Sequence, residues 1–357
     1  MQKNKIVIIM PSLKAGGAQR VIINIIKSLT KKKYKVLLVL ICYKGDLYNT
    51  LPKDIKVEVL NKKRVRYGLF DIFKILKKNK PDIVFSSLAH VNLILLFLKK
   101  FLSKKIKFII REANTPSVIL KSSRIKFLYN ILYRSADKII AQSNLIRSEL
   151  ITSFNINDDL IVRINNPIDV KLVRENIKSF KRFDEKKKIL ISAGRLVYQK
   201  GFDTLIRILS KYNEDFYLII LGEGPEHAYL KEISRKFKIE EKIIFYGYIE
   251  KPWEMIASAD IFLLPSRWEG MPNAALEALA CGTKVIASHQ SGGLIDLKDS
   301  IKNKDIILTN FDNNFIRELE ENTKILKRNV LPSKLPSEFF LENTTSAYIN
   351  LFREIVK

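Results

Sequence analysis

The segment from Ser266 to Gly282, SRWEGMPNAALEALACG, places two glutamates where they could act on one ligand. Asn273 is a good helix N-cap, the residues after it favour helix, and Gly282 is suited to end the helix. Glu277 is therefore expected inside a short helix and Glu269 in the loop before it. A carboxylate accepts several hydrogen bonds, which suits neighbouring hydroxyls of a ribose or a hexose.

The loop between the two glutamates adds an anion site. Its backbone N–H groups and the positive end of the helix dipole can face a phosphate. The predicted donor-binding residues of this loop are Gly270, Met271, Pro272 and Asn273. The alternative is a capped surface helix with two solvated glutamates.

A second chemical segment, GRLVYQKG, directly follows the strand-like run KILISAG. It carries Arg195 and Lys200. Two fixed cations stabilise a diphosphate leaving group more strongly as its charge develops than in the ground state. The alternative is an arginine and a lysine on a solvated loop.

The elements that position these loops occur twice in the same order. Residues 5–42 and residues 188–222 each read as strand, loop, amphipathic helix and strand, and the strands are continuous apolar runs. Such runs predict parallel sheets covered by helices on both faces. We expect two doubly wound α/β domains, with ligands outside the carboxyl ends of the strands.

The spacing Glu269-x7-Glu277, with the glycine, asparagine and small residues around it, resembles the signature of family 4 retaining glycosyltransferases, which have the GT-B fold. The resemblance implies that Glu269 contacts the donor sugar, that Glu277 contacts the ribose, and that the loop amides contact sugar and phosphate. By the same resemblance, Arg195 and Lys200 hold the pyrophosphate of a UDP-sugar. The terminal helix at 338–357 then crosses back to the first domain.

Weaker matches run from about residue 5 to residue 297. Gly16 and Gly17 resemble the double glycine of the family, where backbone closely approaches the donor. The segments LGEGPE and SGGLIDL resemble further glycine turns, although Asp296 replaces a glutamate in the second. There is neither a G-x-G-x-x-G nor a Walker A string, which argues against ordinary dinucleotide or P-loop binding.

The first half resembles bacterial enzymes that extend lipid-diphosphate-linked oligosaccharides or lipopolysaccharide cores, through FIIREANTPSV. Glu112 in this string is the candidate carboxylate at the sheet edge. The histidine of many relatives is absent because Ala113 follows Glu112, so His90 is the nearest catalytic candidate; a structural histidine is the alternative.

A basic amphipathic helix is expected after this string. Its predicted acceptor-binding cations are Lys121, Arg124 and Lys126, interleaved with apolar residues. The resemblance places such a helix beside the acceptor diphosphate. An ordinary surface helix packed by its apolar side is the alternative.

The net charge of +26 is unevenly distributed. Residues 1–168 hold 33 Lys and Arg against 10 Asp and Glu, whereas residues 169–357 hold 30 against 27. A basic half suits an anionic surface, although a lysine-rich genome would also raise the total. Two distant cysteines and no spanning apolar run favour a reducing, cytoplasmic protein, peripheral on the inner face of the membrane.

We expect an N-terminal acceptor-side domain at 1–168, completed by the helix at 338–357, and a nucleotide-sugar-binding domain at 169–337. Residues 309–336, which contain Pro332 and Pro336, are expected to be irregular or loosely packed, and Ser337 is expected to cap the terminal helix. No histidine or cysteine spacing predicts a metal site.

The functional hypothesis is retaining transfer of a hexose or N-acetylhexosamine from a UDP-sugar to a lipid-linked glycan, without a metal. An epimerase-like sugar-nucleotide enzyme is the first alternative. A nucleic-acid-binding protein is the second, although no reading motif supports it.

Overall fold

The computed structural model describes residues 4–120, 122–177, 183–184, 186–301, 304–323 and 331–357. The chain divides into two compact units. The first comprises residues 1–167 and 341–357, and the second residues 168–340. Each unit is built around one parallel sheet.

The first unit contains a seven-stranded sheet in the order β3-β2-β1-β4-β5-β6-β7. The neighbouring strands of this sheet pair in parallel. Its strands are β1 (Lys5–Ser12), β2 (Lys35–Tyr43), β3 (Lys56–Val59), β4 (Ile83–Ser86), β5 (Lys107–Glu112), β6 (Lys138–Ala141) and β7 (Ile161–Arg163).

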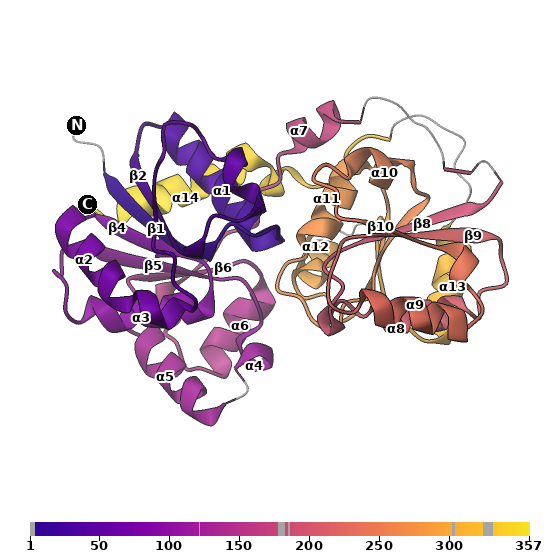
Figure 1. Ribbon diagram of the computed structural model, residues 1–357, viewed down its shortest axis with the longest axis horizontal. Coiled ribbons are helices and arrows are strands. Elements are labelled where there is room, and N and C mark those ends of the chain that lie inside the picture. The colour runs from indigo at the N-terminus through magenta and orange to yellow at the C-terminus, as the bar shows by residue number, and fades with distance from the viewer. Residues whose placement is uncertain (1–3, 121, 178–182, 185, 302–303, 324–330) are drawn as a thin grey trace. The chain divides into compact units, whose positions relative to one another are not determined.

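Helices cover both faces of this sheet (Figure 1). On one face α1 (Gly17–Lys31) and α14 (Leu341–Glu354) pack on the sheet through one apolar cluster. The other face is covered by a second cluster. Its helices are α2 (Leu69–Asn79), α3 (Ala89–Lys99), α5 (Ser123–Tyr133) and α6 (Asn144–Thr152), and the short α4 (Pro116–Ile119) lies between α3 and α6 in sequence.

The second unit contains a six-stranded parallel sheet in the order β10-β9-β8-β11-β12-β13. Its strands are β8 (Lys188–Ala193), β9 (Phe216–Leu221), β10 (Ile243–Gly247), β11 (Ile261–Leu264), β12 (Val285–Ser288) and β13 (Ile306–Thr309). Counted along the chain this order is 3-2-1-4-5-6, that of a doubly wound nucleotide-binding sheet. The order reverses between β8 and β11, so their carboxyl ends border the switch point.

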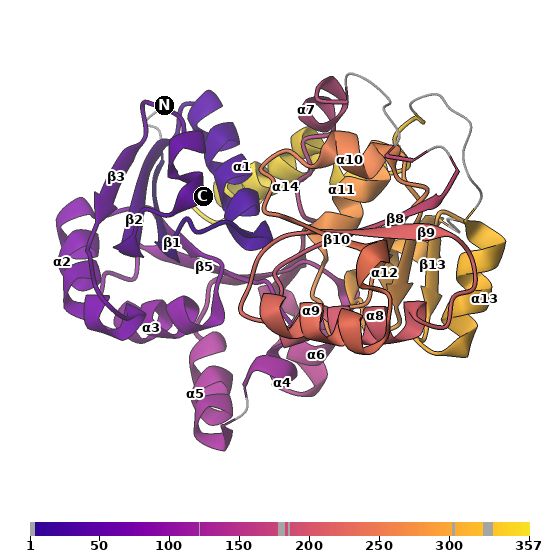
Figure 2. The ribbon, with the colours of Figure 1, turned by 45° about the vertical axis from the view of Figure 1, so that its right-hand side comes forward.

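Two helical layers cover this second sheet as well (Figure 2). One apolar cluster packs α7 (Val170–Glu175), α10 (Trp253–Ser258), α11 (Asn273–Cys281) and α12 (Gly293–Ile301) on one face. The other packs α8 (Phe202–Leu209), α9 (His227–Lys236) and α13 (Asn313–Asn322) on the opposite face. The two doubly wound domains predicted from the alternating pattern are confirmed.

Three local predictions are wrong. Residues 309–336 are not irregular throughout, because α13 forms there and buries Phe315 and Leu319. The terminal helix begins at Leu341, and Ser337 instead opens a separate 3₁₀ turn. Asn273 is the first residue of α11 rather than its cap, since Pro272 precedes it in extended backbone. Gly282 does end α11, with a φ of 88°.

Candidate active site

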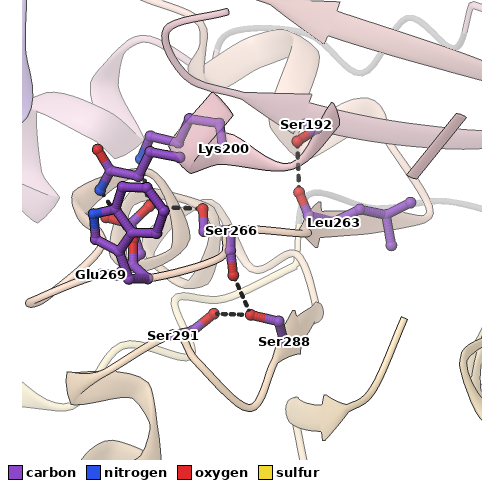
Figure 3. A network of polar contacts seen from close by, with 9 residues as sticks. Ser192, Lys200, Leu263, Ser266, Glu269, Ser288 and Ser291 are labelled. Atoms are coloured by element: carbon purple, nitrogen blue, oxygen red, sulfur yellow. Dashed lines mark hydrogen bonds and ion pairs between the residues drawn. The ribbon is translucent and has the colours of Figure 1, made fainter. Parts of the chain in front are cut away.

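Two loops meet at the switch point of the second sheet. The loop after β8 carries Lys200, and the loop after β11 carries Glu269. The Lys200 ammonium lies 2.5 Å from Glu269 Oε1, and Ser266 donates its hydroxyl to the same oxygen at 2.7 Å (Figure 3). Glu269 is only 7% exposed. The structure therefore brings together a cation and a carboxylate that the sequence assigned to diphosphate and sugar.

Hydrogen bonds from serine hydroxyls connect the strand ends that carry these loops (Figure 3). Ser288 donates to the carbonyl of Ser266 and shares a 3.2 Å hydrogen bond with Ser291. Ser192 donates to the carbonyl of Leu263 at 2.6 Å. These bonds tie together the carboxyl ends of β8, β11 and β12, so the loop that holds Glu269 has a fixed base.

The double glycine of the SGGLIDL segment packs directly against the Glu269 loop. Gly292 has a φ of +54°, and a Cβ placed there would lie 2.1 Å from the carbonyl oxygen of Glu269. Gly293 donates its N–H to the carbonyl of Gly270 at 2.8 Å, and a Cβ on Gly293 would lie 2.2 Å from Met271 Cε. At Gly292 the obstacle is backbone and φ is positive, so only glycine allows this approach.

Glu277 lies one turn inside α11, as expected from the sequence. Its Oε2 accepts a hydrogen bond from the indole N–H of Trp253 at 3.0 Å. Trp253 is the first residue of α10 and is 5% exposed. The indole thus fixes the orientation of one carboxylate oxygen of Glu277.

Arg195 lies on the same loop as Lys200, but its side chain is exposed. Its backbone carbonyl accepts a hydrogen bond from Val197 N–H. Of the two predicted cations, Lys200 is therefore packed against Glu269, and Arg195 extends into solvent.

The predicted residues of the first unit lie at the carboxyl edge of its own sheet. Gly17 begins α1 directly after β1, and Gly16 before it is in extended backbone. His90 lies in the first turn of α3, after β4, and is exposed. Desolvation by the surrounding atoms lowers the pKa of His90.

Glu112 ends β5, but its carboxylate does not face an open site. It is 1% exposed, and its Oε2 accepts hydrogen bonds from Tyr129 at 2.9 Å and Tyr133 at 2.8 Å. Burial raises the pKa of Glu112, although the tyrosine hydroxyls partly oppose that rise. Glu112 therefore anchors α5 to β5, and Asn92 of α3 donates to the hydroxyl of Tyr133 at 3.0 Å. The expectation that this side chain faces a ligand is corrected accordingly.

The basic helix expected after this strand is α5, and it is not packed by its apolar side. Ile125, Leu128 and Ile131 are 43%, 50% and 45% exposed, and Phe127 is 66% exposed. The packed residues are instead Tyr129, Leu132 and Tyr133. The predicted cations Arg124 and Lys126 are exposed, whereas Lys121 lies outside the described residues.

Two features are absent from the residues that the structure describes. No group of three or more His, Cys, Asp or Glu side chains within them is arranged to hold a metal ion. No helix among them has both the length and the apolar character needed to cross a membrane.

Three residues beside the two glutamates were not predicted from the sequence. Ser266 contacts Glu269, Trp253 contacts Glu277, and Arg267 lies two residues before Glu269. Ser266 and Arg267 lie inside the motif segment, but their side-chain directions depend on how the loop folds. Trp253 is 24 residues from Glu277 in sequence, and no local pattern links the two. The tyrosines that bury Glu112 do have a signal, because Tyr129 and Tyr133 are spaced four residues apart on one helix face.

Solved structures identify the class of this fold. The structure of HepE from Anabaena with UDP and glucose matches at a TM-score of 0.79 and 17% identity, covering 98% of this chain and all of that one. The lipopolysaccharide outer core galactosyltransferase WaaB in its apo form matches at 0.73 and 22% identity, covering 98% and 99%. The protein therefore has the GT-B fold of glycosyltransferases.

Two family models then cover most of the chain. The model "Glycosyltransferase Family 4" matches residues 15–172, and "Glycosyl transferases group 1" matches residues 173–321. The chain belongs to glycosyltransferase family 4, and it is a glycosyltransferase.

A curated relative extends this comparison over most of both chains. It is the N-acetylgalactosamine-N,N'-diacetylbacillosaminyl-diphospho-undecaprenol 4-alpha-N-acetylgalactosaminyltransferase of Campylobacter jejuni, 28% identical over 302 residues, which are 81% of this chain and 82% of the relative. The amylovoran biosynthesis glycosyltransferase AmsD of Erwinia amylovora is 27% identical over 272 residues, 74% of each chain.

Proposed function

We propose that this glycosyltransferase moves a hexose or N-acetylhexosamine from a UDP-sugar to a lipid-diphosphate-linked glycan in surface polysaccharide biosynthesis, with retention at the anomeric carbon. The observation that carries the proposal is the ion pair between Lys200 and Glu269 at the switch point of the second sheet. The Campylobacter jejuni relative, whose name specifies a diphospho-undecaprenol acceptor, supports the class of acceptor.

The ion pair explains how the donor enters the site. Without a donor, the ammonium of Lys200 and the carboxylate of Glu269 neutralise each other in a poorly hydrated loop. A diphosphate carries more negative charge than one carboxylate and competes for Lys200. Glu269 stays bonded to the hydroxyl of Ser266. Once Lys200 binds the diphosphate, the carboxylate of Glu269 accepts hydrogen bonds from the sugar.

The remaining roles follow the chemistry of each residue. Arg195, exposed on the same loop, adds a second cation for the departing diphosphate. Glu277, oriented by the indole N–H of Trp253, binds the ribose. Sugar and phosphate are approached by the backbone N–H groups of Gly270, Met271 and Asn273; Pro272, between them, has none. The double glycine at Gly16 and Gly17 approaches the same donor.

The acceptor roles are assigned to the first unit. His90 is the exposed candidate for contact with the reacting groups, whereas Glu112 holds α5 in place. Arg124 and Lys126 on α5, with Lys121, would meet the acceptor diphosphate and the anionic inner face of the cytoplasmic membrane. Neither a metal nor a nucleic acid takes part in this proposal.

Glu269→Ala tests the donor site. Removal of the carboxylate should lower the rate of sugar transfer by about 10²–10³-fold, because a fixed group that orients the reacting sugar is lost. Transfer would be measured with UDP-, GDP- and ADP-sugars and a polyprenyl-diphosphate glycan. Full transfer activity in Glu269→Ala would overturn its role, and donor turnover without any acceptor would favour the epimerase-like alternative.

A further inference from the structure

Arg267 links the two loops of the proposed donor site. It lies two residues before Glu269, and its side chain reaches across to the loop of Lys200. Arg267 Nη1 donates to the carbonyl of Tyr198 at 2.6 Å, and its guanidinium carbon lies 3.9 Å from the centre of the Tyr198 ring. The backbone N–H of Arg267 donates to the carbonyl of Gln199 at 2.8 Å.

The same guanidinium is fixed at its other edge by a bidentate carboxylate. Nη1 and Nη2 donate to Asp203 Oδ1 and Oδ2 at 2.8 and 2.6 Å, and Nη2 also donates to Thr204 Oγ1 at 3.1 Å. The side chains of Arg267 and Asp203 are 24% and 12% exposed. Parallel, charge-assisted bonds of this kind fix orientation far better than a solvated surface pair.

The electrostatics of the cluster keep the pair charged. The hydrogen bonds that Arg267 donates to Asp203 raise the pKa of Arg267. Burial is the largest single influence on the pKa of Asp203 and raises it, but the bonds and charge of Arg267 together with backbone N–H groups outweigh burial and hold that pKa below its ordinary value. Glu226 stands near both, and burial together with the charge of Asp203 raises its pKa.

The position of Arg267 decides what this cluster controls. Tyr198, Gln199 and Lys200 form a single 3₁₀ turn, so a hold on the first two residues sets the place of the third. Gln199 also donates its side-chain amide to the carbonyl of Trp268 at 2.9 Å, next to Glu269. Tyr198 and Gln199, the two residues before Lys200, therefore contact Arg267 and Trp268, the two residues before Glu269.

We propose that Arg267, braced by Asp203, is a positioning residue that sets the separation of Lys200 and Glu269 and so determines donor affinity and the rate of transfer. Arg267 itself does not touch the donor. The inference rests on the proposed function, since it assigns Lys200 and Glu269 to the nucleotide-sugar.

The test compares Arg267→Met, Arg267→Lys and Asp203→Asn with the wild-type chain. Arg267→Met should lower kcat/KM for the donor by about 10–100-fold, because small misplacements of binding groups have effects of this size. The KM for the acceptor should stay within about twofold. Arg267→Lys keeps the charge but loses the bidentate geometry, so it should recover only part of the activity.

Lys334→Met is the matched control. Lys334 forms an ion pair with Asp305 at 2.8 Å in the same unit, with similar exposure, and contacts neither loop. It should leave donor kinetics unchanged. If Arg267→Met does not fold, Asp203→Asn and Arg267→Lys carry the comparison.

The outcomes separate this inference from the proposed function. Wild-type protein that neither binds nor turns over any nucleotide-sugar would overturn the proposed function. If wild type is active and Glu269→Ala is not, but Arg267→Met and Asp203→Asn keep the donor kcat/KM of the control, only the positioning role is overturned. Full recovery in Arg267→Lys would also overturn it, since charge alone would then suffice.

Discussion

Individual carboxylates in this protein differ in what surrounds them, and their surroundings decide what each can do. Glu269 shares one oxygen with an ammonium and a hydroxyl. Glu112 is enclosed by four donors, the hydroxyls of Tyr129 and Tyr133 and the backbone N–H groups of Ala113 and Asn114. A buried carboxylate that is satisfied by donors of its own chain, as Glu112 is, is suited to support the fold.

Glu112→Gln tests the supporting role. The amide can accept on one side only, so donors on the other side lose their partner and the free energy of unfolding should fall by about 1–3 kcal/mol. The value of kcat, measured well below the unfolding temperature, should stay within about threefold of wild type. A stable variant whose kcat drops a hundredfold would instead make Glu112 catalytic.

Asp203 gives a pH signature at the same scale. Its pKa is lowered in the folded protein, because the bonds and charge of Arg267 and nearby backbone N–H groups together outweigh the effect of burial. The ion pair therefore stabilises the fold above the unfolded pKa of about 4, and this stability is lost as pH falls through the lowered pKa. Urea unfolding should show Asp203→Asn less stable than wild type at pH 7, with the difference shrinking near pH 3. A difference that is constant with pH contradicts the pairing.

At the scale of elements, glycines determine how closely strands and helices approach. Gly201 has a φ of +67° and precedes α8, and a Cβ there would lie 2.1 Å from the carbonyl oxygen of Pro265 at the end of β11. The start of α8, and with it Lys200, therefore rests directly on the neighbouring strand end. The same close approach occurs at Gly292, against Glu269.

Gly201→Ala should be far more harmful than Gly247→Ala. Both positions have positive φ, which costs an alanine about 1–2 kcal/mol. At Gly247 the nearest atom to the new Cβ is the end of the Glu223 side chain, 3.7 Å away, so only this conformational cost applies. At Gly201 the clash must move a backbone, so donor binding should weaken as well. Thermal unfolding and donor titration of both variants check this, and equal losses would contradict it.

The sequence predicted some helices and strands correctly and missed others. The apolar runs predicted the parallel sheets, and helix α8 forms between β8 and β9, where the pattern of residues 188–222 predicted an amphipathic helix. Short α13 was missed because its sequence is mostly polar and only Phe315 and Leu319 are buried, so its stability comes from packing on α8 and β13. Likewise, motif spacing found Glu269 and Lys200, whereas their hydrogen bond depends on long-range folding of two loops 69 residues apart.

At the scale of the whole molecule, the net positive charge and the exposed large apolar side chains concentrate in the first unit. Its helix α5 exposes Ile125, Phe127, Leu128 and Ile131 beside Arg124 and Lys126. Further exposed aromatic and basic residues lie on and around α2, among them Tyr67, Phe70, Lys74, Lys77 and Lys78. Basic groups attract anionic lipid headgroups, and apolar side chains enter the interface.

Replacing Ile125, Phe127 and Leu128 together by serine should weaken binding to anionic vesicles by about tenfold or more. An apolar side chain that is fully buried contributes about 1.5–3 kcal/mol, and one that enters a membrane interface contributes part of that. The unfolding temperature should change little, because all three side chains are exposed in the folded protein. Co-sedimentation with vesicles of phosphatidylglycerol and phosphatidylcholine measures the binding. Tyr229→Ser, which removes a 49% exposed ring from α9 in the second unit, is the control. If the triple variant and the control bind alike, or if wild type ignores anionic vesicles at low salt, α5 is an ordinary solvent-exposed helix.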